Sequence, residues 1–122
     1  MTKDPVAMRW SDWADKPNDW NGIVDGEKTG TDLTIIFYST DEIGAGPLLH
    51  VHNYDEVFIV RKGRALFTVG DQKIEAEAGD ILMGPAHVPH KFKNLGPGQL
   101  ETTDIHLSPE FLQTLVDDPH PD

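Results

Sequence analysis

The sequence predicts an all-β fold, a sandwich or barrel built from short strands. Between positions 33 and 107, short runs rich in Val, Ile, Thr, Phe and Tyr recur at intervals of about ten residues. Sequences that favour turns separate these runs, such as Gly70-Asp71 and Gly96-Pro97-Gly98. Short strands at this spacing, joined by such turns, are typical of all-β sandwiches and barrels.

We expect the strands in the following order. The first is rich in β-branched and aromatic residues, and a loop containing Gly44, Gly46 and Pro47 follows it. The second is bent near Asn53-Tyr54, and the third and fourth form a hairpin around Gly70-Asp71. The predicted strands are residues 33–38, 50–60, 64–69, 72–76, 81–83, 90–94 and 100–107.

The two ends of the chain differ from this central part, residues 33–107. Residues 1–32 are polar and irregular, yet they hold all three tryptophans, so we expect this arm to pack on the barrel or on a partner subunit. Residues 108–122 predict a short helix and an acidic tail. Ser108 is a suitable N-cap, Pro109 suits the first helical position, and positions 111, 112, 115 and 116 form an apolar stripe.

Composition excludes several classes of function. A chain of 122 residues forms one domain, and the absence of cysteine rules out disulfides and thiolate metal sites. A net charge of -11 argues against nucleic acid and against an anionic membrane surface. The N-terminal residues contain no apolar stretch of the kind that a signal peptide needs. We therefore expect a soluble, cytoplasmic protein.

Three potential metal ligands lie at even offsets in one predicted strand: His50, His52 and Glu56. Successive side chains of a strand alternate between its two faces, so these three point the same way if the strand is continuous. Two imidazoles and a carboxylate would then face the space where an apolar core is expected. This arrangement indicates a bound cation.

A second stretch, residues 79–94, contributes a further histidine. His90 lies on a predicted strand directly after a loop that contains Pro85 and Pro89. The prolines stiffen this loop and thereby orient His90.

These two stretches resemble the two conserved motifs of the cupin family. The first motif is matched at every position and the second at all but one, where His87 replaces the usual glycine. The matching residues are Gly44, His50, His52, Glu56 and Gly63, then Gly79, Pro85, His90 and Asn94. The resemblance covers roughly residues 33–107, and it implies a β-barrel of jelly-roll type.

The resemblance also implies that His50, His52, Glu56 and His90 hold one metal ion inside the barrel. Three imidazoles and one carboxylate suit a divalent transition metal, and the ligand types do not choose among Fe, Mn, Ni, Co, Cu and Zn. An octahedral ion with four protein ligands keeps two positions for water, dioxygen or a bidentate substrate. Glu56 is the weakest of the four ligands, and its alternative role is that of a catalytic base.

Two other histidines have alternative roles. His87 is either an imidazole that contacts a ligand near the mouth of the barrel or a solvent-exposed loop residue. His106 lies on the last predicted strand and shares its parity with Asp104. If this face points inward, His106 is a candidate proton shuttle, because imidazole changes its charge near neutral pH.

The leading functional hypothesis is a small metal-dependent enzyme, dioxygenase-like or using other Lewis-acid chemistry, that acts on a small oxygenated organic substrate. Glu56 or His106 would move a proton in this reaction. The alternative is a non-enzymatic module that binds a small molecule or is stabilised by its metal. Sugar isomerase or epimerase activity fits less well, because this acidic sequence offers no obvious basic clamp for phosphate. We expect a homodimer, since jelly-roll sheets leave edges that need covering.

Overall fold

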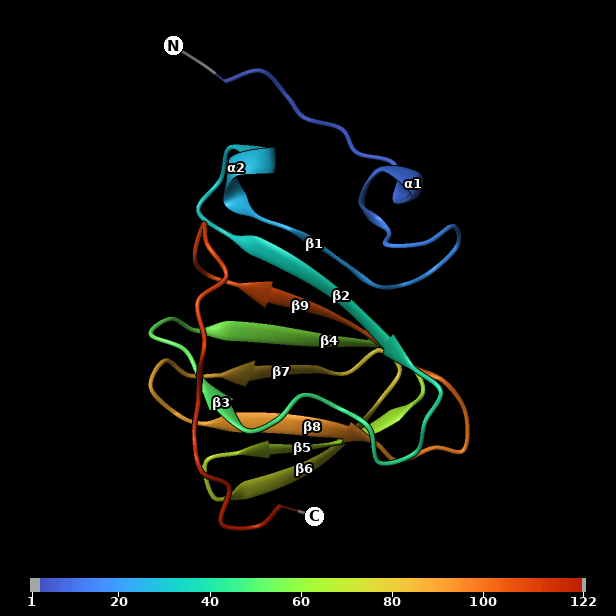
Figure 1. Cartoon of the computed structure of the whole chain (residues 1–122), viewed down its shortest axis with the longest axis vertical. Coiled ribbons are helices and arrows are strands. Elements are labelled where there is room, and N and C mark those ends of the chain that lie inside the picture. Colours follow the sequence, from blue (N-terminus) through green and yellow to red (C-terminus); the bar gives the residue numbers. More distant parts are fainter. Residues whose placement is uncertain (1–2, 122) are drawn as a thin grey trace.

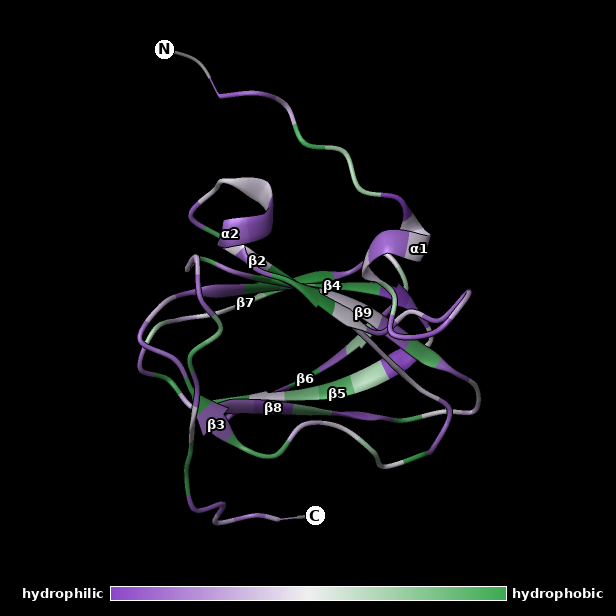
Figure 2. Cartoon of the chain, turned by 45° about the horizontal axis from the view of Figure 1, so that its top comes forward, coloured by the Kyte–Doolittle hydropathy of each residue, from purple (hydrophilic) through white to green (hydrophobic). Residues whose placement is uncertain are grey.

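The structure, a computed structural model, describes residues 3–121 and contains two five-stranded sheets that face each other (Figures 1 and 2). All strand pairs are antiparallel. The first sheet has the order β1 (Gly22–Val24), β2 (Thr34–Thr40), β9 (Leu100–His106), β4 (Glu56–Lys62), β7 (Ile81–Gly84). The second has the order β10 (Thr114–Leu115), β3 (His50–Val51), β8 (His90–Asn94), β5 (Arg64–Val69), β6 (Gln72–Glu77). The all-β jelly-roll prediction is confirmed.

The predicted strand over residues 50–60 is in fact two strands in different sheets. β3 belongs to the second sheet and β4 to the first, so residues 52–55 carry the chain from one sheet to the other. The break falls at the expected bend, Asn53-Tyr54. His50, His52 and Glu56 are nevertheless all buried, which shows that their side chains point inward.

The interior changes from apolar to polar along its strands. Val60 and Phe58 of β4 are each 1% exposed, and Glu56 follows them on the same inward face. On β9 the inward face runs from Leu100 to His106. One end of the barrel therefore holds the hydrophobic core, and the other end holds buried polar groups. The core residues are Phe58, Val60, Ala65, Phe67, Ala76, Leu82, Phe92 and Leu100.

The N-terminal arm is less irregular than predicted. It contains two four-residue helices, α1 (Trp10–Trp13) and α2 (Gly26–Thr29), and strand β1, which pairs with β2. β1 was missed because three residues are too few to show an alternating pattern. Trp13 stacks on Phe37 of β2 with ring centroids 3.6 Å apart, so the arm covers the outer face of the first sheet (Figure 2). Within residues 3–121, neither helix has the length or hydropathy needed to cross a membrane.

The predicted C-terminal helix is wrong. Residues 108–116 contain no helix, and β10 pairs instead with β3 of the second sheet. We call residues 108–118 the C-terminal strap, because they run across the open end of both sheets (Figure 1). The Thr34 hydroxyl donates to the Ser108 carbonyl at 2.9 Å, and the Val116 amide donates to the Leu49 carbonyl at 3.3 Å. A helix this short is marginal alone, so these tertiary hydrogen bonds prevail over local propensity.

Candidate metal centre

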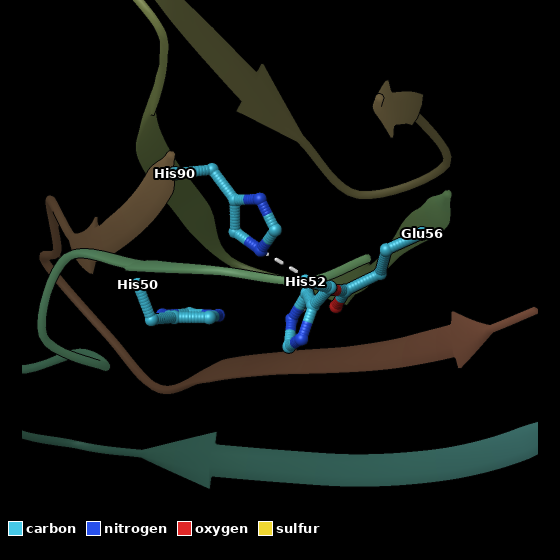
Figure 3. A group of neighbouring side chains, drawn as sticks. All are labelled: His50, His52, Glu56 and His90. Carbon is cyan, nitrogen blue, oxygen red and sulfur yellow. Dashed lines mark ion pairs between the residues drawn. The ribbon is translucent and has the colours of Figure 1, made fainter. Parts of the chain in front are cut away.

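The four residues predicted as metal ligands come together inside the polar end of the barrel (Figure 3). His50 lies on β3, His52 directly after it, Glu56 begins β4 and His90 begins β8. His50 and His90 are direct partners in the β3–β8 pair, so the sheet register brings them together. All four are at most 5% exposed, and one ligand atom from each lies within 4.8 Å of the others.

Several of these atoms have no hydrogen-bond partner among the described residues. His52 Nε2 and His90 Nε2 each lie 3.0 Å from Glu56 Oε1, but none of the three atoms makes a hydrogen bond of acceptable geometry. Buried polar atoms without partners are costly, and native proteins seldom leave them so. Convergent imidazole nitrogens and a carboxylate oxygen are the donors that a divalent transition metal takes. The group therefore fits a metal ion.

Backbone carbonyls orient two of the imidazoles. His50 Nδ1 lies 2.6 Å from the Leu48 carbonyl oxygen, and His52 Nδ1 lies 2.7 Å from that of Leu112. A carbonyl only accepts, so Nδ1 carries the proton in both rings and Nε2 keeps its lone pair. Such contacts commonly fix the tautomer and ring orientation of metal-binding histidines. The Leu112 contact also makes the C-terminal strap part of the site.

The protonation states also suit a metal. Burial lowers the pKa of His50 to about 4, so its ring is neutral at pH 7. Burial alone would raise the pKa of Glu56, but the contact with the His106 imidazole is the largest of the opposing effects, which together hold this pKa well below its usual range. Metal ligation requires neutral imidazoles and an ionised carboxylate.

His106 faces the interior and contacts the second oxygen of Glu56. Its Nε2 lies 3.1 Å from Glu56 Oε2, and its Nδ1 lies 2.6 Å from the Tyr54 hydroxyl oxygen. The Leu112 amide donates to the same Tyr54 oxygen at 3.3 Å, and burial raises the Tyr54 pKa to about 12. The Tyr54 hydroxyl has two acceptors within reach of its single proton, His106 Nδ1 and the Leu112 carbonyl oxygen at 3.0 Å. When it donates to Nδ1, a neutral His106 donates from Nε2 to Glu56. The sequence does not indicate that Tyr54 is part of the site, since its position in a bend does not reveal its partner.

The structure places the His87 side chain on the surface, outside the group of four. Its backbone φ is 68°, a left-handed conformation that explains why cupins usually have glycine here. The His87 amide donates to the His52 carbonyl at 2.8 Å, so this turn packs against the segment that carries one candidate ligand.

A cavity of about 190 Å³ adjoins the group of four. His50, Glu56 and His106 form its polar wall, and Phe58, Phe92 and Phe111 form an apolar one. Asp104 also lines the cavity and is only 5% exposed. The sequence placed Asp104 on the same face as His106 but did not single it out. The alternation of side chains along the strand places Asp104 and His106 on one face, but whether that face is buried depends on the opposite sheet.

Comparison with known proteins identifies the family. The family model described as "Cupin domain" matches residues 37–106, more than half of the chain. Two uncharacterized proteins are similar: one from Methanocaldococcus jannaschii is 36% identical over 55 residues, and one from Streptomyces coelicolor is 41% identical over 44 residues. These alignments cover 44% and 36% of this chain, and 44% and 42% of the two relatives, so this chain matches less than half the length of each.

Solved structures show the same fold. A structure of Bacillus subtilis oxalate decarboxylase from a study of its Mn(II) centres superimposes with a TM-score of 0.71 at 22% identity. A second structure of that enzyme, at pH 4.6, gives the same values. Each match covers 78% of this chain and 27% of the longer decarboxylase. These similarities show the fold, and the match to the family model over residues 37–106 shows the family: the chain belongs to the cupin family.

Proposed function

We propose that this cupin binds one divalent transition metal through His50, His52, Glu56 and His90. The observation that carries the proposal is the convergence of buried ligand atoms without hydrogen-bond partners among the described residues. A group held only by protein contacts would be expected to satisfy those atoms. Manganese is a candidate within the set Fe, Mn, Ni, Co, Cu and Zn, because the structurally similar oxalate decarboxylase has Mn(II) centres.

We further propose that the protein is a metal-dependent enzyme acting on a small oxygenated organic substrate. The bound metal would supply Lewis-acid chemistry or dioxygen activation at the coordination positions that the protein leaves open. The adjoining cavity of about 190 Å³ has room for roughly six water molecules, which suits a substrate of only a few carbon atoms. Its phenylalanine wall excludes water from one side of such a substrate.

Within this proposal, Glu56 and His106 handle the proton. Glu56 Oε1 faces the imidazoles of His52 and His90, while Oε2 faces His106 Nε2. A proton on Nε2 is therefore held against the carboxylate at the wall of the cavity, and the Tyr54 hydroxyl supports the other side of the ring. The pair can accept or return a proton without a water molecule between them.

Elemental analysis of freshly purified protein tests the metal. We expect about one equivalent of a transition metal in the wild type, a large loss in His90→Ala, and no loss in His120→Ala, whose imidazole lies in the exposed tail. Metal-free wild type after extended dialysis against each candidate ion would contradict the proposal.

Turnover distinguishes the enzyme from a non-enzymatic module. Metal-loaded protein is incubated with a panel of small keto acids, diketones and hydroxy acids under air and under nitrogen. Turnover that His90→Ala abolishes supports the enzyme. A chelator that lowers the melting temperature, with no turnover and no ligand-induced change in the metal spectrum, supports the module instead.

The homodimer stays a prediction. Ile81 and Met83 are 68% and 53% exposed on the outer face of β7, and a second copy of the chain would cover them. Sedimentation at the monomer mass in dilute protein at physiological salt would contradict it.

A further inference from the structure

Asp104 is a buried carboxyl group that the proposed metal site does not use. It is 5% exposed, it lines the cavity beside the candidate metal centre, and its Oδ1 has no hydrogen-bond partner among the described residues. A buried polar atom without a partner is costly, so its presence at a cavity wall calls for a partner inside the cavity.

The surroundings of Asp104 favour a neutral carboxylic acid. Among the described residues that line the cavity, none is a lysine or an arginine. Burial is the main cause that raises the pKa of Asp104 well above its usual range, and it remains when a metal offsets the negative charge of Glu56, while the Thr102 side chain acts in the opposite direction. A neutral carboxylic acid has one O–H to donate, whereas a carboxylate only accepts.

The sheet register shows where this donor lies relative to the metal centre. His106 is the direct partner of Glu56 in the β4–β9 pair, and Asp104 is the partner of Phe58, two residues further along β4. Two residues of a strand span about 7 Å. Asp104 is therefore one strand step deeper in the barrel than Glu56 and His106. His50, Glu56 and Asp104 line the same cavity, so one small ligand in it can contact both the metal centre and Asp104.

We propose that Asp104 is a specificity-determining residue for a small metal-bound 2-oxo acid. It donates a hydrogen bond to the substrate oxygen that lies furthest from the metal. This inference rests on the proposed function, since it requires a metal at His50, His52, Glu56 and His90. A 2-oxo acid carries a keto oxygen and two carboxylate oxygens, more acceptors than the metal held by these four residues would need to bind it. Its second carboxylate oxygen remains free to accept from Asp104.

The test compares two variants of Asp104 in cobalt(II)-loaded protein. Asp104→Asn keeps a neutral hydrogen-bond donor of the same shape, whereas Asp104→Leu removes the donor at similar volume. Asp104 Oδ1 has no hydrogen-bond partner among the described residues that its removal would leave unpaired, so both variants should remain folded. Pyruvate is titrated against the visible absorption of the cobalt ion. Azide, which binds a metal without a carboxylate oxygen, reports whether the metal site is intact.

We expect Asp104→Leu to weaken pyruvate binding by at least about tenfold, because a hydrogen bond to a charged oxygen is lost. Asp104→Asn should stay within about threefold of the wild type, and azide should bind all three proteins equally. Infrared difference spectra should show the carbonyl stretch of a protonated acid that shifts when pyruvate binds and that is absent in Asp104→Asn.

Three results would overturn the inference. The first is unchanged pyruvate affinity in both variants. The second is tighter binding in both, which is the behaviour of an ionised Asp104 that repels the anion. The third is an equal loss in Asp104→Asn and Asp104→Leu.

Failure of the proposed function looks different from failure of this inference. If the wild type takes up no cobalt, or if neither azide nor pyruvate perturbs its spectrum, the metal site is refuted. If the wild type binds pyruvate but the Asp104 variants behave alike, only the role of Asp104 is refuted.

Discussion

Replacing Tyr54 with phenylalanine should loosen the C-terminal strap and destabilise the protein. The hydroxyl lies 2.6 Å from His106 Nδ1 and 3.0 Å from the Leu112 carbonyl, and it accepts from the Leu112 amide at 3.3 Å. The hydroxyl has one proton to share between His106 Nδ1 and the Leu112 carbonyl. Tyr54→Phe removes these contacts but preserves the ring, which stacks on His52 with centroids 4.7 Å apart. The effect therefore reports hydrogen bonding and not the loss of packing.

The magnitude follows from which partners water can reach. The Leu112 carbonyl keeps its 2.7 Å contact with His52 Nδ1, and the residue is 46% exposed, so losing its contacts with the Tyr54 hydroxyl loosens the strap at a small cost in free energy. His106 is 2% exposed, and its Nδ1 would be left without a partner, which costs about 1–3 kcal/mol. We expect the free energy of unfolding of metal-free protein to fall by about 2 kcal/mol, a decrease in melting temperature of roughly 6–10 °C.

Urea unfolding followed by circular dichroism measures this change, and Tyr38→Phe is the matched control. The Tyr38 hydroxyl has Thr40 of the same strand as its neighbour, so its removal should cost less than about 0.5 kcal/mol. Amide exchange at Thr114 and Leu115 should accelerate in Tyr54→Phe, since β10 is part of the strap. Equal losses in the two variants, or unchanged exchange in β10, would refute the account of a strap held by the Tyr54 hydroxyl.

Three further predictions concern pH and the backbone. Metal-free protein should lose stability as pH falls from about 6.5 to about 4, because unfolded His50 takes up its proton near 6.5 and folded His50 only near 4. The urea midpoint should depend less on pH across this range in His50→Gln than in the wild type, and an equal pH dependence in the two proteins would contradict this. His87→Gly should raise the free energy of unfolding by about 0.5–1 kcal/mol, because it relieves a φ of 68°; a lower melting temperature would count against it. Gly63→Ala should cost at least about 2 kcal/mol, since φ is +87° and the added Cβ would lie 2.4 Å from the Gln99 carbonyl oxygen; a melting temperature like that of the wild type would exclude such strain.

Much of the barrel could be predicted from the sequence, because the signals that specify its strands and turns lie within short stretches of the chain. β-branched and aromatic runs, turn residues and the alternation of side chains set strands such as β5 and β8 within a residue or two. The prediction failed where a long-range partner decides the conformation. Ser108 and Pro109 are sound local signals for a helix, but Leu112 bonds to Tyr54 and His52, and β10 pairs with β3.

For the candidate metal centre too, some features could be predicted from the sequence and others required the tertiary structure. By itself, the sequence predicted the fold class and the four residues of the candidate centre, because strand patterns and the spacing of the two cupin motifs are properties of the chain. Parity along one continuous strand was not the reason, since β3 and β4 lie in different sheets. Only the tertiary structure decided which backbone carbonyls orient His50 and His52, that His106 and Tyr54 complete the network around Glu56, and that Asp104 lies without a partner in the adjoining cavity. Burial and hydrogen bonding depend on segments more than fifty residues apart, and no local pattern encodes them.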